Sequence, residues 1–328
     1  MPSYSCTVDN TIPAGLRLDR YIAEYLRLLS RSQIKARKLA AAINGKPVKI
    51  SRILSGGEHL ELAWEEAESI HLIPENLPLD ILYSDSRVIV INKAQGMVVH
   101  PGAGNRHGTL ANALYYMMLK RQCEENPALD GQSNLNALAP LGLRPGIVHR
   151  LDKDTSGVII AAWDDEAHAY LSSQFRTRKA IKSYAALVLG CPKDASGCIN
   201  KSIIRSPRDR KAFTVSGNKG RPSITYYKLV KTYGKCSLLL LRPKTGRTHQ
   251  IRVHLKYLGN PILGDSIYGR NDPRFKNLPL MLHAKRLSLL LPSDCMKKKS
   301  TFDVTLIGRP KTFRTPLPPR FRQIIDSL

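Results

Sequence analysis

One stretch near the middle of the chain constrains the fold more than any other. It reads Gly146-Ile147-Val148-His149-Arg150-Leu151-Asp152-Lys153-Asp154-Thr155-Ser156-Gly157, and apolar residues resume over 158–161. Asp152 therefore stands at the edge of a predicted buried strand, where a carboxylate is costly unless it is paired or hydrogen-bonded. Hydroxyls and backbone N–H groups of the turn at 155–157 could provide that pairing. The stretch predicts either an Asx-type turn that satisfies only local groups or a loop that presents Asp152 for chemistry.

The charge balance points to a polyanionic partner. Lys and Arg outnumber Asp and Glu by 51 to 26 in 328 residues, a formal net charge of +25. A chain of this length can form one large catalytic domain and a small accessory domain. Its excess charge favours binding to nucleic acid or to an anionic membrane surface. No apolar run is long enough to span a bilayer and the first residues lack a signal-peptide pattern, so we expect nucleic acid and no membrane.

Cysteine and histidine usage gives no sign of a metal site. The six cysteines contain no C-x-x-C pair, and the nine histidines contain no H-E-x-x-H motif. Scattered cysteines in a chain this long are typical of a reducing compartment, so a cytoplasmic protein without a bound metal is expected.

Residues 13–72 are predicted to form a small domain of two helices followed by short strands. Leu18, Ile22, Leu26 and Leu29 recur at helical spacing. A second helix is predicted over 33–42, with Ser30 or Ser32 as its N-cap, before a turn at Asn44-Gly45.

The second predicted helix and the turn after it are strongly basic. Between 25 and 57 there are eight cations and no acid: Arg27, Arg31, Lys35, Arg37, Lys38, Lys46, Lys49 and Arg52. Such a run can be only a solvated face, but its lack of counter-charge favours a surface that tracks phosphates, with Arg31, Lys35 and Lys38 as candidate RNA-binding residues. The segment also resembles an S4 RNA-binding domain in three pieces: Leu16-Arg17-Leu18-Asp19-Arg20-Tyr21-Ile22, Ser30-Arg31-Ser32 and Ile43-Asn44-Gly45-Lys46-Pro47-Val48.

A proline-containing linker over 73–79 separates this domain from a second one over 80–328. Strands are predicted there at 80–83, 88–92, 157–162, 183–189, 226–231 and 236–242, and helices at 110–120 and 164–176. Strands outnumber helices, which predicts an α+β domain with a mixed, largely antiparallel sheet. The polar segment 126–143 is predicted to be a surface insertion.

Four segments of this second domain resemble RluA-type RNA pseudouridine synthases, in the order found in that family. They are Val88-Ile89-Val90-Ile91-Asn92-Lys93 with Gly96-Met97-Val98-Val99-His100-Pro101-Gly102, the Asp152 loop, Lys182-Ser183-Tyr184-Ala185, and Thr245-Gly246-Arg247-Thr248-His249-Gln250-Ile251-Arg252 continuing to Asp265. Ala94 replaces the proline that usually follows Asn-Lys, a change expected to loosen a turn. The order of the segments is more specific than any one of them.

The resemblance implies roles for Asp152, Arg252, Tyr184 and Arg150, and the residues themselves suggest roles for Arg247 and Leu287. Asp152 acts at C1′ of the uridine, where an oxocarbenium-like carbon needs an adjacent anion. Arg252 forms an ion pair with Asp152, and Tyr184 stacks on the uracil and takes part in proton movement. Arg150 fills the place of the flipped uridine, Arg247 binds phosphate, and Leu287 forms an apolar wall of the uracil pocket. The basic segment 205–235 is expected to be a mobile loop beside the site.

The implied activity is a cofactor-free isomerisation of uridine to pseudouridine in RNA. The pieces His100-Pro101-Gly102-Ala103-Gly104-Asn105 and Gly108-Thr109-Leu110 resemble the RluD type. They imply a monomer that acts on large-subunit ribosomal RNA, in free RNA or in a pre-50S-like particle, and a transfer RNA target stays open. Two alternatives are a catalytically silent ribosome-assembly factor with the same fold and a hydrolase that uses Ser156 with His149, although Ser156 lacks a G-x-S-x-G motif.

Overall fold

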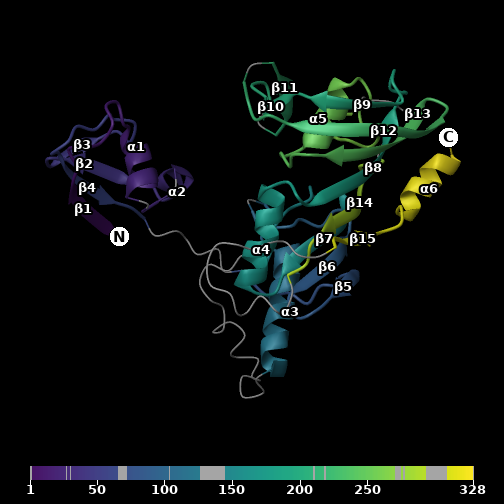
Figure 1. The fold of residues 1–328 in the computed structure, drawn as a ribbon, viewed down its shortest axis with the longest axis horizontal. Helices are drawn as coiled ribbons and strands as arrows, with labels where there is room; N and C mark the ends of the chain where they lie inside the picture. Colours follow the sequence, from purple (N-terminus) through teal and green to yellow (C-terminus); the bar gives the residue numbers. More distant parts are fainter. Residues whose placement is uncertain are drawn as a thin grey trace. The chain divides into compact units, whose positions relative to one another are not determined.

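The computed structural model describes residues 2–26, 28–29, 31–65, 72–102, 104–125, 145–209, 211–217, 219–269, 275, 278–292 and 309–327. The predicted insertion at 126–143 lies outside these residues. The chain divides into two compact units, Met1–His71 and Leu72–Leu328 (Figure 1). Each unit has a hydrophobic core of its own. Among the described residues, no helix combines the length and apolar character needed to cross a membrane.

The first unit is a small antiparallel sheet covered by short helical turns. Its strands pair in the order β1-β4-β2-β3. The elements are β1 (Ser3–Thr7), α1 (Leu18–Arg20), a π-helical turn (Tyr21–Tyr25), α2 (Arg31–Ala36), β2 (Ala40–Ile43), β3 (Lys46–Val48) and β4 (His59–Ala63). The predicted apolar stripe is confirmed, because Leu18, Ile22 and Leu29 are buried in this core. The unit begins before residue 13, since β1 pairs along its whole length with β4.

The second predicted helix is wrong in its C-terminal part. α2 ends at Ala36, and the chain then turns through Lys38, which has a positive φ of 46°. Residues Ala40–Ile43 form β2, in register with both β3 and β4. Pairing on two sides therefore outweighs the helix propensity of the alanines in this segment. The predicted turn at Asn44-Gly45 is confirmed, and both residues have the positive φ of a tight hairpin.

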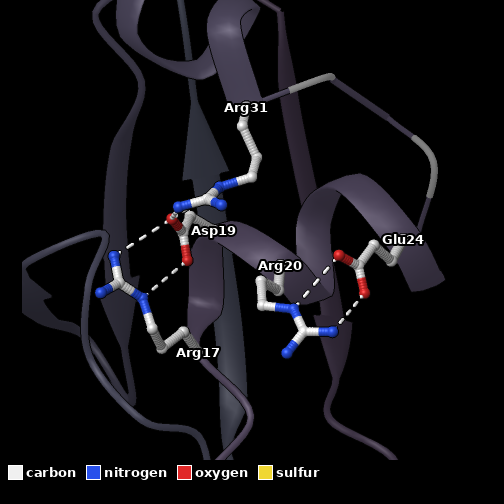
Figure 2. Close-up of polar contacts among 5 residues, drawn as sticks. All are labelled: Arg17, Asp19, Arg20, Glu24 and Arg31. Atoms are coloured by element: carbon white, nitrogen blue, oxygen red, sulfur yellow. Dashed lines mark hydrogen bonds and ion pairs between the residues drawn. The ribbon is translucent and has the colours of Figure 1, made fainter. Parts of the chain in front are cut away.

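Asp19 is the centre of an ion-pair cluster in the first unit (Figure 2). Its carboxylate accepts hydrogen bonds from Arg17 Nε at 3.0 Å and from Arg31 Nη2 at 2.7 Å. Burial raises the pKa of Asp19, but the hydrogen bonds from the two arginines outweigh burial and leave the pKa below its usual value. Arg20 and Glu24 form a separate, exposed pair beside this cluster.

Several cations of the basic run in the first unit form ion pairs, which the sequence does not predict. Arg31 binds Asp19, Lys38 Nζ lies 2.9 Å from Glu65, and Arg52 pairs with Glu58. These carboxylates lie outside the window 25–57 in sequence but beside it in the fold. The expectation of eight cations without counter-charge is therefore wrong for Arg31, Lys38 and Arg52. Within the described residues, Lys35, Lys46 and Lys49 are exposed and form no ion pair.

The second unit contains a nine-stranded mixed sheet and the longer helices. The strand order is β5-β6-β7-β14-β8-β13-β12-β9, with β15 paired to β14. The sheet strands are β5 (Ile81–Ser84), β6 (Val88–Lys93), β7 (Ser156–Ala162), β8 (Ile181–Leu189), β9 (Ser196–Asn200), β12 (Ile224–Tyr233), β13 (Cys236–Pro243), β14 (Leu282–Leu289) and β15 (Lys311–Arg314). The helices are α3 (Leu110–Glu125), α4 (Asp165–Arg176), α5 (Gln250–Tyr257) and α6 (Pro319–Asp326). The predicted fold class is confirmed, because β7 and β14 are the one parallel pair among the described strands.

Alternating side chains of the sheet form cores with different helices. Ile89, Ile91 and Ile159 pack in one cluster with α3, whereas Val88, Val90 and Ile160 pack in another with α4. Because neighbouring residues in a strand point to opposite faces, α3 and α4 cover opposite sides of this part of the sheet (Figure 1). α4 begins at Asp164, whose side chain accepts a hydrogen bond from the backbone N–H of Ala167.

The basic segment 205–235 is not a loop. It starts at the last residue of β10 (Ser202–Arg205), which pairs with β11 (Phe213–Ser216) in a hairpin, and it contains β11 and the whole of the long strand β12. β12 pairs on one side with β13 and on the other with β9, so its backbone is held within the sheet. The expectation of a mobile loop is therefore wrong for this part of the chain.

Candidate active site

A cavity of about 470 Å³ in the second unit brings together five of the predicted site residues. Asp152 comes from the loop before β7, and Tyr184 from β8. Arg150 precedes Asp152, Arg247 comes from the loop between β13 and α5, and Arg252 comes from the first turn of α5. Residues up to about a hundred positions apart in sequence lie close together here, because β8 pairs with both β13 and β14.

The Asp152 loop is fixed by backbone and apolar contacts. Leu151 is buried in the main core, and the backbone N–H of Thr155 donates to the carbonyl of Asp152. The side chain of Asp152 keeps 20 % of its surface exposed, in the cavity. The turn hydroxyls do not pair with it, contrary to expectation. Ser156 accepts a hydrogen bond from Arg320 Nη2 at 2.6 Å and lies 2.8 Å from His283 Nδ1.

Lys93, at the end of β6, holds the Asp152 loop in place through hydrogen bonds. Its buried ammonium donates to the carbonyls of Ala94, Met97 and Lys153, at 2.8, 2.8 and 3.1 Å. The backbone N–H of Gly96 also donates to the carbonyl of Lys153, the residue directly after Asp152. Burial lowers the pKa of Lys93 to about 8, against the opposing charges of Asp154 and Asp152. In sequence Asn92-Lys93 is only part of a family motif, and its pattern does not indicate this anchoring role.

Arg252, in the first turn of α5, lies between two carboxylates. Its Nη1 is 3.6 Å from Asp152 Oδ2, which is the ion pair that the resemblance implies. A fork of two shorter hydrogen bonds joins Nε and Nη2 to Asp265, at 2.8 and 2.7 Å. Although burial lowers the pKa of Arg252, the hydrogen bonds and charge of Asp265 outweigh it and raise that pKa. The guanidinium is therefore charged and oriented before any substrate arrives.

Asp265 is the site-supporting residue that the sequence analysis did not single out. Its side chain is fully buried, and its Oδ1 also accepts the backbone N–H groups of Ile267 and Tyr268. The one signal in the sequence was its position, as the first acid after a segment rich in cations. A buried carboxylate next to a buried arginine predicts such a pair, but only the fold shows which arginine it binds.

Tyr184 forms a wall of the cavity and is 9 % exposed. Burial raises its pKa, and the charge of Asp152 raises it further. The phenol therefore keeps its proton at neutral pH. The geometry fits an aromatic surface against a flat ring, and it does not favour a phenolate that accepts protons in the free enzyme.

The backbone is strained directly before α5. His249 caps this helix with a positive φ of 54°, a conformation that costs free energy for a residue other than glycine. Its Nδ1 lies 2.9 Å from the hydroxyl of Tyr268, and its ring meets Phe213 edge to face. Next to it, Gln250 is buried and binds Thr245, Thr225 and the backbone N–H of Arg247. These bonds fix the path that places Arg247 and Arg252 in the cavity.

The cavity is strongly cationic. Among the described residues, Asp152 is the one acid that lines it, and seven lysines and arginines line it as well: Arg150, Arg176, Arg178, Lys182, Lys244, Arg247 and Arg252. Four of these cations were not predicted: Arg176, Arg178 and Lys244 lie outside the quoted motifs, and Lys182 is the first residue of one of them. Burial lowers the pKa of Lys182. A cavity of this composition favours a ligand with several negative charges.

Leu287 does not belong to this cavity, so its predicted role is wrong. It is 1 % exposed and packs with Leu171 of α4 and Phe313 of β15. Leu282 on the same strand lines the cavity instead. A bulge between His283 and Arg286 shifts the register, so both leucines face the same side of β14 but meet different neighbours. The candidates Arg31, Lys35 and Lys38 lie in the first unit.

The hydrolase alternative is also excluded by the geometry of its residues. Ser156 is buried outside the cavity lining and contacts His283. His149 Nε2 accepts the backbone N–H of Ile160, and its ring stacks on Phe175. Burial lowers the pKa of His149 to about 3. Ser156 and His149 therefore have separate structural partners.

Comparisons with known proteins agree with this arrangement. Residues 87–257 match the model of the family described as RNA pseudouridylate synthase. A relative from Borreliella burgdorferi, "Ribosomal large subunit pseudouridine synthase D", is 40% identical over 87% of this chain and 85% of its own length. One of the same name from Pasteurella multocida is 34% identical over 96% and 91%. The solved structure of human RNA Pseudouridylate Synthase Domain Containing 4 covers 75% of this chain and 92% of its own, with 25% identity and a TM-score of 0.54.

The matched region contains β6, β7, β8 and α5, the elements that supply Lys93, Tyr184 and Arg252, together with the Asp152 loop. The family match covers more than half of the chain, and the relatives match nearly all of it. This chain therefore belongs to the RNA pseudouridylate synthase family and is an RNA pseudouridine synthase.

Proposed function

We propose that this enzyme isomerises uridines of large-subunit ribosomal RNA, with Asp152 acting at C1′ of the flipped nucleotide. The observation that carries the proposal is the partly exposed carboxylate of Asp152, ion-paired with Arg252, in a cavity whose other charged lining residues, among those described, are lysines and arginines. An anionic RNA strand is attracted to such a cavity, and the one anion in it is available for the reacting sugar.

The chemistry needs one carboxylate and no water. The N1–C1′ bond breaks and its electron pair leaves with the uracil, while the carboxylate of Asp152 stabilises the electron-poor C1′. The uracil turns within the cavity, C5 forms a bond to C1′, C5 loses its proton, and N1 gains one. The product is an isomer of the substrate, so no second carboxylate is needed to activate water. Asp152 as the one acid lining the cavity supports this role.

Tyr184 is proposed to stack on the uracil and keep it in place while it turns. Its aromatic ring lines the same cavity as Asp152, and burial raises its pKa, so its hydroxyl is a proton donor at neutral pH. In this role the phenol contributes a flat surface and a hydrogen bond. Proton removal from C5 by Tyr184 would first require it to give its own proton away.

The cations of the cavity are proposed to hold the RNA around the flipped base. Arg150 is exposed next to Asp152, where a guanidinium can stack in the space left by the extruded uridine. Arg247, held at its backbone by Gln250, is placed to bind a phosphate. Extrusion of a base costs a few kcal/mol of stacking and pairing, which these contacts offset.

The first unit is proposed to be an S4-like RNA-binding domain, residues 13–72 in the family pattern. Lys35 supports this role with an exposed charge, whereas Arg31 and Lys38 would bind RNA only by sharing or leaving their carboxylate partners. The names of the two bacterial relatives refer to the large ribosomal subunit, which supports ribosomal RNA over transfer RNA as the target. That target would place the enzyme in the cytoplasm, acting as a monomer on free RNA or on a pre-50S-like particle.

The substrate can be tested with RNA labelled with tritium at C5 of uridine. Pseudouridine formation expels that hydrogen into water, whereas binding alone does not. Large-subunit ribosomal RNA, small-subunit ribosomal RNA and transfer RNA would be compared under identical conditions. We expect release from the large-subunit RNA or from an immature large subunit. Release from transfer RNA alone would contradict the proposed target but not the activity.

A further inference from the structure

A second cavity of about 410 Å³ opens on the other side of the catalytic sheet. It is lined by residues of β8, β12, β13, β14 and β15, and it shares no lining residue with the active-site cavity. Its wall includes Ser183, whereas Tyr184 lines the active site. Because successive side chains of a strand point to opposite faces, the two cavities lie on opposite faces of β8.

Cross-strand pairing places a row of cations along this second cavity. Arg286 is directly opposite Ser183 on one side and opposite Arg314 on the other. Arg242 is directly opposite Tyr226, and Lys228 opposite Leu240. Lys285 completes a set of five cations in the cavity wall. Like charges directly opposite one another destabilise a sheet, so Arg286 and Arg314 are arranged at a cost that a bound anion would offset.

These cations have no acidic partner within the described chain. The ion pairs of the second unit involve other residues, and the cavity wall itself contains no carboxylate. The Nε atom of Arg286 is buried without a hydrogen-bond partner, and its Nη2 reaches only the hydroxyl of Ser183, at 3.4 Å. The guanidinium of Arg286 is therefore not neutralised by a carboxylate of the described chain and can attract a phosphate to the cavity wall.

Apolar and aromatic surface lies within the same cavity. Tyr226 is 42 % exposed and Leu240 is 37 % exposed, although both belong to central strands of the sheet. An exposed tyrosine beside arginines and lysines fits an unpaired base that stacks while its phosphates meet the cations. A lipid surface would need a protruding apolar face, but this surface is hollowed.

We propose that this groove binds a single-stranded segment of the substrate RNA, separate from the nucleotides in the active site. The proposal goes beyond the modification reaction, because none of its residues touches the reacting uridine. It predicts that a long RNA binds two faces of the sheet at once. A long RNA would then bind more tightly than a short stem-loop, because the second contact is intramolecular.

Ultraviolet crosslinking of the wild-type protein to a long large-subunit RNA fragment tests the contact without any substitution. We expect RNA adducts on the β12 peptide that contains Tyr226 or on the β13 peptide that contains Arg242. A short stem-loop that supplies only the target uridine should not give these adducts. Adducts confined to the active-site segments with the long RNA would overturn the proposal.

Charge removal provides a second, quantitative test. Arg242→Gln/Arg314→Gln should weaken binding of the long fragment roughly 10- to 30-fold near 0.1 M salt and reduce the slope of log K against log salt by about 1.4, as expected for two lost phosphate contacts. Lys193→Gln/Lys235→Gln is the matched control, because it removes two exposed charges from turns outside both cavities. Neither protein should melt below the wild type, since all four side chains are exposed and Arg314→Gln removes the like-charge pair with Arg286.

The binding experiments test the groove independently of the modification activity. An equal, small effect of both double variants on affinity would overturn the groove, since it would show only a loss of net charge. An unchanged affinity for RNA, with an acidic peptide bound in the groove instead, would also overturn it and would indicate a protein partner. Tritium release from a short stem-loop reports the modification reaction independently of either result.

Discussion

Arg252 lies between Asp152 and Asp265, and the two carboxylates hold it in different ways. Asp265 binds it with two short hydrogen bonds from a fully buried position, whereas Asp152 lies 3.6 Å away and stays partly exposed. The fork to Asp265 therefore fixes the direction of the guanidinium. The longer contact leaves Asp152 free to meet the sugar while its charge is still stabilised.

Asp265→Asn should lower kcat by about 10²-fold with a smaller change in KM, because it frees a guanidinium that positions Asp152. The same change leaves a buried charge without its partner, so the free energy of unfolding should fall by about 3–5 kcal/mol. Single-turnover kinetics and urea denaturation measure the two effects. Asp194→Asn, at an exposed turn, is the control. A raised KM for RNA with unchanged kcat would show that Asp265 does not act through Arg252.

Lys93 gives the reaction an alkaline limit. Its pKa is lowered by burial to about 8, and its proton is needed to donate to three carbonyls at once. Above pH 8 one of these bonds is lost, the Asp152 loop loosens, and kcat should fall with a midpoint near 8. Lys93→Met should be slow at every pH and show no such midpoint. A wild-type rate that stays constant from pH 7 to 10 would contradict this role.

The folding stability should respond to Lys93 in the opposite direction. Its pKa is lower in the folded state than in the unfolded chain, where it is about 10.5. The contribution of Lys93 to the free energy of unfolding therefore increases as pH rises from 8 to 10.5. Between pH 8 and 10.5, kcat should therefore fall while the contribution of Lys93 to the free energy of unfolding increases. This difference distinguishes a loosened loop from general unfolding.

At the scale of elements, α6 is attached to the sheet through a buried polar chain. Arg320 of α6 donates to Ser156 of β7, which contacts His283 of β14 at 2.8 Å. Phe321 is fully buried beside them and meets the ring of His283. Burial, reinforced by the charge of Arg320, lowers the pKa of His283 to about 4.

Because His283 is buried in this hydrogen-bond chain, we expect the protein to lose stability in acid. The unfolded His283 binds a proton near pH 6.5, but the folded one does so only near pH 4, so the free energy of unfolding should fall between these values. The shift corresponds to roughly 3 kcal/mol for this group. His283→Gln should lose most of that pH dependence in urea denaturation, and His168→Gln on α4 should keep it. Equal pH dependence in wild type and His283→Gln would contradict the assignment.

Elements with a strong hydrophobic pattern could be predicted from the sequence, whereas strands stabilised mainly by pairing with other strands could not. β6, β7, β8, β12 and β13 lie within two residues of their predicted bounds, because their apolar runs are long and rich in branched residues. β2 was predicted as helix, since its alanines favour helix locally and become a strand only through pairing with β3 and β4. β9, β10 and β15 are short and largely polar, so no period indicated them.

The same limit applies to the candidate site. Asp152, Tyr184 and Arg252 were found because they lie in motifs, and the structure places all three in one cavity. Leu287 was chosen wrongly because it is covered by Leu171 of α4 and Phe313 of β15, and such contacts between distant segments cannot be read from sequence. Lys93 and Asp265 act through buried hydrogen bonds to segments far away in the chain, and such bonds leave no local pattern. The groove on the second face is invisible in sequence for the same reason, because it combines five strands.

At the scale of the whole molecule, positive charge is divided among separate surfaces. The active-site cavity, the groove on the opposite face of the sheet and the exposed lysines of the first unit each present cations. Each surface can contribute phosphate contacts to one long RNA. We therefore propose that the net charge of +25 contributes to RNA affinity, whereas the carboxylate of Asp152 takes part in the chemistry.

Removal of free charge from the first unit should weaken RNA binding without damage to its fold. Lys35→Gln/Lys46→Gln/Lys49→Gln should reduce the salt slope for a long ribosomal RNA by about 2 and leave the melting temperature unchanged. Arg31→Gln should instead lower the stability of this unit, because Arg31 holds Asp19. Filter binding over a salt series and thermal melts measure both effects. An unchanged salt slope in the triple variant would show that this unit does not bind RNA.

The most direct test of the central claim is tritium release by wild type and Asp152→Asn from large-subunit RNA labelled at C5 of uridine. The substitution keeps the shape of the side chain and removes the anion proposed to act at C1′. We predict that release falls by at least about 10³-fold while the Kd for RNA changes less than about threefold. Release at a near wild-type rate from Asp152→Asn would contradict the account, because the isomerisation would then proceed without the one carboxylate of the cavity.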